Sequence, residues 1–487
     1  MNIRHLVHVI SLMLMAVSAA LAVTTAVAFV YGDGDGPAFL LASAIALAVG
    51  FAGHRTTEIV RDLSVREGYA VVAFAWVVIG LAGALPFIFT GVVDTPVDAV
   101  FESISGFTTT GATVFGDIEA LPHGILLWRS FTQWLGGMGI IVLGIAILPY
   151  LGVGGMQLFK AEVPGPTPER LQPRIAQTAK LLWYVYAGMT GAQVLLYLSG
   201  GLSLFDAVTH AFSTMSTGGF SPRSASIAAF DSAYVQYVTI VFMFLAGVNF
   251  APHYRALSSR GRIYVRDAEF RFYAAVLLGA ALLVAALVFG SGAAGDLGAE
   301  RVVRDALFQV VSIGTTTGFL TRDYELWPLG AQLVLLALMF MGGMSGSTGG
   351  GVKTVRIHVL LRHVVSEMKK SLHPRAVVAT RVGTKVVGEG VLLNVLAFLL
   401  VFFILYGAGV LLLALLGHDL PTAVGASAAA IGNIGPGLGE VGAVDNYGWM
   451  GSGSELVLMF LMVAGRLELF TVLLLFHPDL WRGARWR

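Results

Sequence analysis

The chain contains 487 residues, of which 56% are hydrophobic and only 12% are charged, and its formal net charge at pH 7 is +1. A mean hydropathy of +0.79 is more than a soluble domain of this length needs, and it indicates a polytopic membrane protein. The absence of cysteine excludes a disulfide scaffold and a thiolate metal site.

Ten apolar stretches of about 20 residues, long enough to cross a bilayer, recur along the chain. They are expected near residues 6–31, 37–53, 70–91, 124–150, 181–200, 234–252, 272–290, 330–350, 391–417 and 455–477. The first stretch lacks a small-residue cleavage signature at its end, so we interpret it as a retained helix. The sequence thus predicts an all-α polytopic membrane protein with ten transmembrane helices.

Positive charge is concentrated in alternate loops. Of the 30 Lys and Arg residues, 24 lie at the N-terminus and in the segments 54–69, 152–180, 253–271, 351–386 and 478–487. The opposite loops hold five, namely Arg129, Arg223, Arg301, Arg304 and Arg322. Basic loops face the cytoplasm, so we expect both termini there. The same bias explains the basic loops without a nucleic-acid partner.

Four short, weakly apolar stretches, each too short to cross a bilayer, lie in the long outer loops and end in glycine. They read DAVFESISGFTTTG (98–111), DAVTHAFSTMSTG (206–218), DALFQVVSIGTTTG (305–318) and TAVGASAAAIGNIG (422–435). Each has an apolar stretch before it and another after it. In the following stretch a second glycine recurs, at Gly137, Gly247, Gly343 and Gly465.

This periodicity predicts a unit of span, short helix, glycine-ended loop and span, repeated four times around one axis. We therefore expect a two-helix N-terminal unit at 1–66, followed by pore repeats at 67–175, 176–268, 269–383 and 384–487. The third repeat is expected to contain an intramembrane gating loop.

Re-entrant loops of this kind imply a pore, because non-helical backbone at membrane depth must be buried in protein or face a water-filled cavity. Hydroxyl and carbonyl oxygens suit a hard cation that sheds its water. Short helices opening at Asp98, Asp206, Asp305 and Thr422 would aim their negative C-terminal ends at the axis. The residues expected to bind the ion are Thr109, Thr110, Gly111, Ser216, Thr217, Gly218, Thr316, Thr317, Gly318, Asn433, Ile434 and Gly435.

The composition of the four loops bears on which ion they select. No carboxylate lies within them, which favours a monovalent over a divalent cation. Only one glycine per repeat is shared, so we expect weaker selectivity than in a filter made of four identical carbonyl ladders.

The set of motifs resembles a known family. Four repeats with one filter glycine each, TTTGAT in the first and NIGPGLGEVG (433–442) in the last, are similar to the Trk/Ktr/HKT superfamily of cation transporters over essentially the whole chain. The two-span preface and the GPGLGEVG stretch most resemble the bacterial TrkH-type membrane subunit. The fourth loop departs from the family pattern, because Ile434 stands where Thr or Ser is expected and can offer only its carbonyl.

This resemblance implies potassium uptake across the bacterial cytoplasmic (inner) membrane, with K+ as the transported ion. It also implies a homodimer in the lipid bilayer and a cytosolic TrkA-type ring that binds NAD or another nucleotide and gates the pore.

The eighth apolar stretch contains FMGGMSGSTGGGVKT (340–354), which has too many Gly and Ser residues to hold a straight helix. We expect it to break at mid-membrane, and the resemblance implies that the resulting loop obstructs the pore and moves on gating. A close-packed helix crossing built from small residues is the alternative. The residues expected to take part in gating are Gly346, Ser347, Thr348, Gly349, Gly350, Lys353 and Arg466.

Arg466 is the only Lys or Arg in the interior of an apolar stretch, since Arg129 lies near the start of one, and it is costly there unless it faces water, a carboxylate or backbone carbonyls. We expect it to face the pore below the filter and to donate to the 345–351 loop. A structural ion pair within the membrane is the alternative. Glu468 is not an obvious partner, because it points about 200° round a helix from Arg466.

Other functions are less consistent with the sequence. GLGEVG (437–442) and GGGVKT (349–354) resemble phosphate-binding motifs but lack the required βαβ or Gly-Lys context. An enzyme is not expected, because the eighth stretch supplies no base for Ser345 or Ser347. A transporter with inverted repeats would place successive units on opposite sides, whereas all four loops fall outside. A symporter that couples K+ to H+ or Na+ stays open as the alternative to a passive channel.

Overall fold

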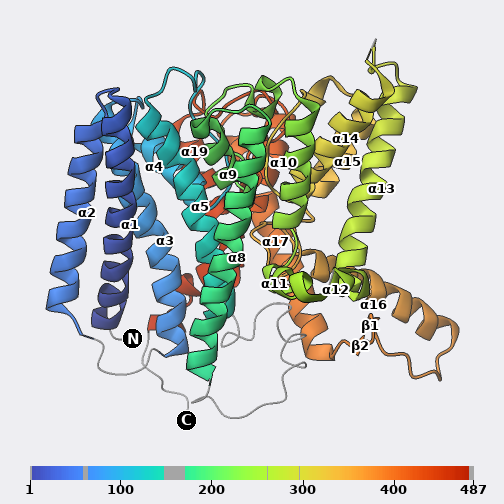
Figure 1. Ribbon diagram of the computed structural model, residues 1–487. Helices are drawn as coiled ribbons and strands as arrows, with labels where there is room; N and C mark the ends of the chain where they lie inside the picture. Colours follow the sequence, from blue (N-terminus) through green and yellow to red (C-terminus); the bar gives the residue numbers. More distant parts are fainter. Residues whose placement is uncertain (1–2, 59–63, 147–170, 260, 296, 482–487) are drawn as a thin grey trace.

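The computed structural model describes residues 3–58, 64–146, 171–259, 261–295 and 297–481, and it is mostly helical (Figure 1). Within these residues the strands β1 (Arg381–Val382) and β2 (Lys385–Val386) form one short antiparallel hairpin, in which Arg381 pairs with Val386.

Within the part of the chain that the structure describes, six helices are long and apolar enough to cross a membrane: α1 (Ile3–Tyr31), α2 (Gly36–Thr56), α3 (Val65–Thr90), α8 (Leu171–Ser199), α13 (Ala268–Gly290) and α17 (Glu389–Leu415). A bent pair, α19 (Ser452–Arg466) with Phe470–Phe476, would add a seventh. The other expected spans contain α5 (His123–Ala146), α10 (Ala233–Ala246) and α15 (Leu329–Met339). The predicted all-α polytopic membrane fold is confirmed, although α10, α15 and α19 are shorter than the apolar stretches that predicted them.

The short spans end where the sequence carries its recurring glycines. Gly247 caps the end of α10, and Gly343 lies in the non-helical segment 340–353 between α15 and α16 (Thr354–Leu372). The chain bends by 114° after α19, where Glu468 and Leu469 have φ values of 63° and 48° that residues other than glycine rarely adopt. These helices therefore end within the apolar stretches that were expected to form continuous spans.

Four pore helices precede the glycine-ended loops: α4 (Pro96–Phe107), α9 (Leu204–Met215), α14 (Ala299–Gly314) and α18 (Leu420–Gly432). Their starts differ from the prediction. Thr95, Ser203 and Asp419 are the N-caps of α4, α9 and α18, and they accept the backbone N–H three residues on, from Asp98, Asp206 and Thr422. α14 begins six residues before Asp305. Asp98 is the third residue of α4 and completes a capping box with Thr95. It therefore stabilises the N-terminus of the helix, although Thr95 and not Asp98 is the N-cap.

The N-terminal helices α1 and α2 pack along each other and against α3 and α5 (Figure 1). Leu14, Phe39 and Trp128 belong to the core cluster that joins them, and Trp128 Nε1 donates to the carbonyl of Gly83 over 2.9 Å. The predicted unit boundaries near 67, 176, 269 and 384 lie close to the first residues of α3, α8, α13 and α17.

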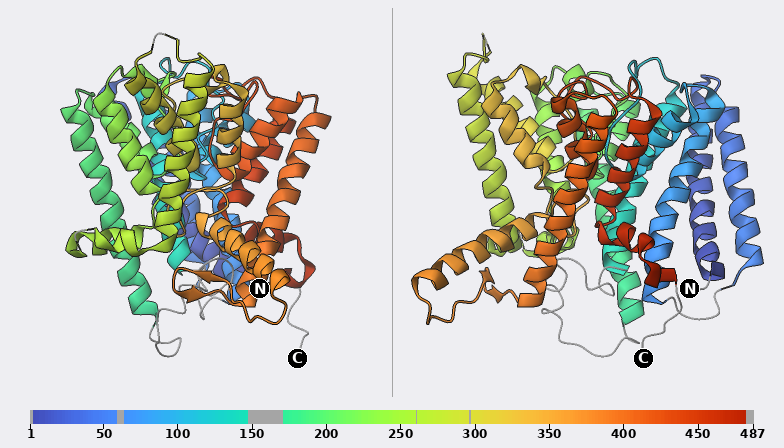
Figure 2. Two further views of the ribbon diagram at one scale, coloured as in Figure 1. Left: turned by 90° about the vertical axis from the view of Figure 1, so that its right-hand side faces the viewer. Right: turned by 180° about the vertical axis from the view of Figure 1, so that it is seen from behind.

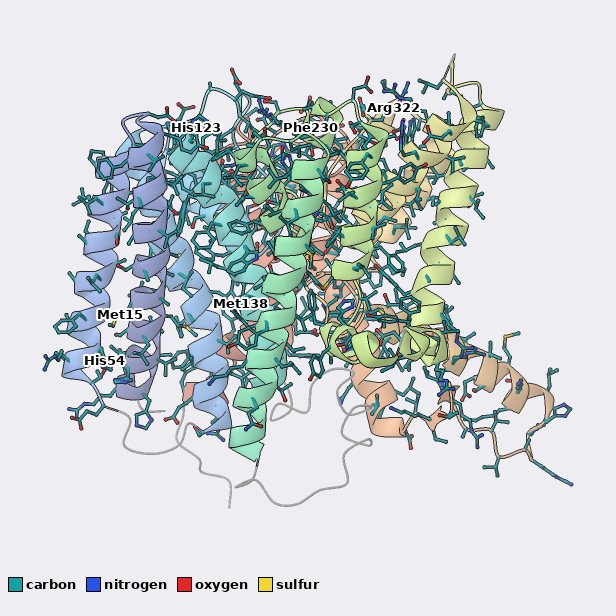
Figure 3. All side chains as sticks on the ribbon, in the orientation of Figure 1. Met15, His54, His123, Met138, Phe230 and Arg322 are labelled. Atoms are coloured by element: carbon teal, nitrogen blue, oxygen red, sulfur yellow. The ribbon has the colours of Figure 1, made fainter. Side chains whose placement is uncertain are left out.

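The molecule has two distinct ends. His123, Phe230 and Arg322 lie toward one end and His54 toward the other, with Met15 and Met138 between them (Figure 3). The helices α4, α9 and α14 lie in the half of the molecule toward the first end (Figure 1). At the second end are α11 (Phe250–Ser259), α12 (Arg262–Arg266) and α16, which projects from the bundle with the β1–β2 hairpin (Figures 1 and 2). α16 exposes large apolar side chains at Leu361, Val364, Val365, Met368 and Leu372.

Candidate cation-conducting site

The four loops that follow the pore helices share one backbone conformation. We call residues 108–111, 216–219, 315–318 and 432–435 filter loops 1 to 4. The second residue of each has a positive φ: Thr109 (54°), Thr217 (54°), Thr316 (62°) and Asn433 (55°). The N–H of the third residue donates to the carbonyl five residues earlier over 2.8 to 2.9 Å, in the pairs Thr110–Ser105, Gly218–Ser213, Thr317–Ser312 and Ile434–Ala429. These two features align the repeats independently of side-chain type.

The fourth residue of each filter loop is a glycine with positive φ: Gly111 (84°), Gly219 (79°), Gly318 (82°) and Gly435 (97°). A Cβ at each would come closer than 3.0 Å to a carbonyl oxygen of the next repeat: Gly218 for Gly111, Thr317 for Gly219, Ile434 for Gly318 and Thr110 for Gly435. The series returns to its starting loop, so the four filter loops form one closed ring. Glycine is required here by both its backbone conformation and the close approach.

This ring corrects the predicted register of the second repeat. The sequence aligned Gly218 with the closing glycines of the other repeats, but Gly219 holds that position and Gly218 corresponds to Thr110. Ser216 accordingly lies one residue before the positive-φ position. The error has a simple origin, because two adjacent glycines satisfy the same sequence pattern.

A pocket of about 100 Å³ lies over the ring on the side of the outer loops. All four ring glycines line it, as do the residues that follow them, among them Ala112, Phe220, Leu320 and Pro436. Arg129 and Asp445 supply charged groups at its wall. The pocket that borders the ring is therefore lined by residues of all four repeats.

Filter loops 1 and 3 are fixed by hydroxyl groups in the same way. In filter loop 1 the Thr108 and Thr110 hydroxyls lie 2.8 Å apart, and Ser105 donates to the carbonyl of Ala112 over 2.6 Å. In filter loop 3 the equivalent Thr315–Thr317 and Ser312–Phe319 distances are 2.8 and 2.6 Å. Such buried, mutually satisfied hydroxyls hold a backbone in one conformation.

Filter loop 4 is fixed differently. Asn433, a residue that tolerates positive φ, donates from Nδ2 to the Thr110 hydroxyl over 3.1 Å and to the carbonyl of Met462 over 2.9 Å. The side chain of Ile434 is fully buried in an apolar cluster. Filter loop 4 therefore contributes backbone rather than a hydroxyl at the position of Thr110 and Thr317.

The four filter loops carry no carboxylate of their own. Among the described residues, no group of three or more His, Asp or Glu side chains is placed to hold a metal ion. Arg129, which lines the pocket, belongs to a buried ion pair, in which its Nε on α5 lies 2.6 Å from Glu102 Oε1 on α4 and both side chains are at most 1% exposed. The groups that the filter loops themselves can offer to a cation are therefore backbone, hydroxyl and amide oxygens.

The segment 340–353, which we call the intramembrane loop, is bonded to residues of the second and third repeats. Its Gly350 N–H donates to the Thr316 hydroxyl of filter loop 3 over 2.7 Å. Its Thr348 hydroxyl donates to the carbonyls of Met215 and Ala246 at 3.1 and 3.2 Å. The predicted break in the eighth apolar stretch is therefore present, and the loop contacts the filter.

Arg466 and Lys353 converge on this loop. Arg466 is 3% exposed, and its Nη1 donates to the carbonyl of Thr348 over 2.6 Å, as the sequence predicted. Lys353 Nζ donates to the carbonyl of Gly349. Glu468 forms an ion pair with Arg356 at the start of α16 and not with Arg466. The loop is thus held by two cations that bind its backbone carbonyls.

The remaining expected gating residues are part of the same loop. Gly346 accepts the N–H of Phe250 at its carbonyl over 3.1 Å, and Ser347 donates to the carbonyl of Met344 over 2.6 Å. Ser345 N–H donates to Glu269 Oε1 on α13 over 2.7 Å, a contact that the sequence did not predict.

Two side chains of α5 were missed by sequence reasoning. Gln133 Nε2 donates to the carbonyl of Gly218 over 2.6 Å, and Arg129 Nη1 donates to the carbonyl of Ser221 over 3.0 Å. A signal was available, since an Arg and a Gln four residues apart on an apolar helix share one face.

At the outer end, a polar contact joins the N-terminal unit to the first repeat. Asp33, between α1 and α2, accepts the backbone N–H of His123 over 2.8 Å and contacts its ring Nδ1 at 2.7 Å. The backbone N–H of His123, followed by its ring, lowers the pKa of Asp33 below the ordinary value of 3.8.

Comparison with known proteins identifies the family. The family model described as TrkH, cation transport protein, matches residues 35–483. The chain belongs to the TrkH family.

TrkH relatives match it from end to end. The Trk system potassium uptake protein TrkH of Halomonas elongata is 39% identical, and that of Escherichia coli K12 is 40% identical, each over 99% of this chain and 100% of the relative. The crystal structure of the potassium transporter TrkH from Vibrio parahaemolyticus superimposes with a TM-score of 0.91 at 38% identity, covering 99% of this chain and 100% of that one.

Proposed function

We propose that the chain is a potassium uptake channel or transporter of the bacterial cytoplasmic membrane. The observation that carries the proposal is the closed ring of filter loops, in which each glycine accommodates a carbonyl of the next repeat. The names of the relatives from Halomonas elongata and Escherichia coli, both potassium uptake proteins, support the choice of ion. Both termini would lie in the cytoplasm, at the end that carries α16 and most of the Lys and Arg residues.

The proposed K+ filter consists of Thr109, Thr110, Gly111, Thr217, Gly218, Gly219, Thr316, Thr317, Gly318, Asn433, Ile434 and Gly435, with Ser216 supporting the second loop. Carbonyl oxygens at Thr110, Gly218, Thr317 and Ile434 would replace water around the ion. The C-terminal ends of α4, α9, α14 and α18 reach these loops, and their partial negative charge favours a cation.

The proposed gate is the intramembrane loop with Arg466 and Lys353. The loop is bonded to filter loop 3 through Gly350, and Arg466 holds it through Thr348. A loop held by a few polar contacts beneath a pore can move aside when those contacts are exchanged. The positive charge of Arg466 would also lower cation occupancy below the ring while the loop is in place.

The proposed partners are a second copy of the chain and a cytosolic TrkA-type ring that binds NAD or another nucleotide. The end of the molecule formed by α11, α12 and α16 carries basic residues and the exposed apolar side chains of α16, and it offers a docking surface for such partners. Displacement of α16 would reach the gate directly, since α16 begins at Thr354 where the intramembrane loop ends.

The test is growth of a potassium-uptake-deficient bacterium at low external potassium. The chain should restore growth, and Gly318→Ser should abolish it, because a Cβ at Gly318 would overlap the carbonyl of Ile434. Gly279→Ser is the matched control, because no atom lies within 4 Å of a Cβ at this exposed position of α13. Growth that survives Gly318→Ser at equal protein levels would refute the filter, and failure of the unmodified chain to transport potassium would refute the function.

A further inference from the structure

Filter loop 2 differs from the others at its third position. Filter loops 1, 3 and 4 carry Thr110, Thr317 and Ile434 there, whereas filter loop 2 carries Gly218, followed directly by Gly219. Two consecutive glycines give a backbone far more conformational freedom than Thr-Gly. Filter loop 2 therefore needs support that the other loops obtain from their own side chains.

Gln133 of α5 occupies the space in which the missing side chain would lie. A Cβ on Gly218 would come closer than 3.0 Å to the Cδ, Oε1 and Nε2 atoms of Gln133. Gln133 is fully buried, and it belongs to repeat 1 rather than to the loop it contacts. The small residue of one repeat and the large residue of another are thus complementary in shape.

Gln133 also makes two hydrogen bonds that bracket Gly219. Its Nε2 donates to the carbonyl of Gly218 over 2.6 Å, and its Oε1 accepts the N–H of Phe220 over 3.0 Å. The carbonyl of Gly218 is the one that approaches Gly111 in the ring. A single amide side chain therefore fixes the orientation of a ring carbonyl and of the peptide that follows the ring glycine.

The hydroxyl contacts of filter loops 1 and 3 are missing from filter loop 2. Ser216, which corresponds to Thr108, donates to the carbonyl four residues earlier, as Thr108 and Thr315 do, but Gly218 offers it no hydroxyl partner. Ser213, which corresponds to Ser105, has no hydrogen-bond partner for its hydroxyl among the described residues. In filter loop 2, the two hydrogen bonds of Gln133 replace the hydroxyl–hydroxyl contact and the serine–carbonyl hydrogen bond of filter loops 1 and 3.

One turn earlier on the same face of α5, Arg129 extends this support. Its Nη1 donates to the carbonyl of Ser221 over 3.0 Å, and its Nη2 donates to the Thr113 hydroxyl over 3.1 Å. Glu102 orients Arg129 through the buried ion pair at 2.6 Å. Gln133 and Arg129 together therefore bind α5 to the backbone of filter loop 2 and the residues after it, at Gly218, Phe220 and Ser221.

We propose that Gln133 is a positioning residue that determines cation selectivity, by taking in the second repeat the place of the threonine side chain of repeats 1 and 3. The proposal rests on the proposed filter function. A ring carbonyl without this support could rotate to fit a smaller ion, so Na+ would be discriminated less well against K+.

A double-mutant cycle between Gln133 and Gly218 tests this inference, with K+, Rb+ and Na+ uptake measured in proteoliposomes. Gln133→Ala should lower the ratio of K+ to Na+ uptake about tenfold, equivalent to about 1.4 kcal/mol. Gly218→Thr alone should abolish uptake through its clash with Gln133. The double variant Gln133→Ala/Gly218→Thr should recover most of the ratio, because the new hydroxyl has room and can reach Ser216 as Thr110 reaches Thr108.

Gln193→Ala is the matched control, since Gln193 is a fully buried glutamine of α8 that donates to the Tyr197 hydroxyl and does not contact a filter loop. The inference is overturned if Gln133→Ala keeps the wild-type ratio, if Gln193→Ala lowers it equally, or if the double variant is as defective as the two single effects combined. Where Gln133→Ala yields no folded protein, Gln133→Met retains the volume and is measured instead. If that also fails, recovery of folded protein in the double variant supports the inference, and its absence overturns it. Uptake of K+ by the unmodified chain decides the proposed function separately.

Discussion

Arg466 donates a hydrogen bond from Nη1 to the backbone carbonyl of Thr348 over 2.6 Å, and its Nη2 lies 3.5 Å from the carbonyl of Gly136. One arginine of the fourth repeat therefore joins the intramembrane loop of the third repeat to α5 of the first. The intramembrane loop that this link holds is itself bonded to filter loop 3 through Gly350.

Arg466→Ala is expected to raise cation flux severalfold, because the loop loses a tether and the pore loses a positive charge beneath the ring. The measurement is the initial rate of Rb+ uptake in proteoliposomes at equal protein content. Arg466→Lys serves as the comparison, since it keeps the charge but cannot reproduce the two-directional donation of a guanidinium. A rate that stays at the wild-type level in Arg466→Ala would count against a gating role.

Gly219→Ser is expected to abolish growth at low potassium as completely as Gly318→Ser. A Cβ at Gly219 would overlap the carbonyl of Thr317, and the φ of 79° disfavours any side chain. The result distinguishes two alignments of the second repeat. In the structure Gly219 is the closing glycine of the filter loop, whereas the sequence pattern assigned Gly218 to that position and placed Gly219 after the filter. Growth of the Gly219→Ser strain, with the protein present in the membrane, would contradict the alignment of the second repeat.

Breaking the Glu102–Arg129 pair should destabilise the protein strongly. Glu102→Ala leaves a buried guanidinium without its carboxylate, and removal of one partner of a buried ion pair typically costs about 3–5 kcal/mol. Thermal unfolding in detergent should show a clear fall in Tm.

The surface pair Asp231–Arg301, 3.9 Å apart with the two side chains 92% and 47% exposed, provides the contrast, and Asp231→Asn should cost about 1 kcal/mol or less. Equal Tm changes in Glu102→Ala and Asp231→Asn would show that burial does not set the cost.

Asp33→Asn should weaken the contact between the N-terminal unit and α5, and the effect should depend on pH. The pKa of Asp33 is lowered in the folded state, so its carboxylate stabilises the protein above pH 3.8 and this contribution is lost as pH falls through the folded value. Since Asp33 is 32% exposed, the difference should be below about 1 kcal/mol.

Unfolding of Asp33→Asn and wild type should be compared between pH 7 and pH 3. The difference in Tm should be present at pH 7 and should shrink toward pH 3. Asp94→Asn, at another exposed aspartate of the outer loops, is the control. A Tm difference that grows on acidification would reverse the assigned sign.

Several elements were predictable because they depend on local composition. The alternation of apolar stretches and basic loops predicts the helices, and the repeated glycine-ended loops predict a ring that Gly111, Gly318 and Gly435 indeed help to form. Arg466 could be assigned to the intramembrane loop because a lone arginine at membrane depth must bind carbonyls or carboxylates.

Other features depend on contacts between repeats, which the sequence pattern of a single repeat indicates only weakly. The choice between Gly218 and Gly219 is decided by the carbonyl of Thr317, which lies 98 residues further along the chain than Gly219. In the sequence, Gln133 is simply a polar residue within an apolar stretch, and only its contact with Gly218 in the structure shows its role in supporting filter loop 2. The N-caps of α4 and α9 were predicted three positions too late, because an aspartate at the third position of a helix looks in the sequence like an aspartate that caps it.

The ring made by successive glycines and carbonyls has a consequence for how the sequences of the four repeats can diverge. A tetramer of identical subunits repeats every substitution four times, whereas a single gene that encodes all four quadrants can vary each one alone. Such a gene can accumulate changes stepwise while the other repeats stay the same. Asn433 and Ile434 are changes of this kind within the fourth repeat, and Gln133 with Gly218 is a complementary pair shared between the first and second repeats.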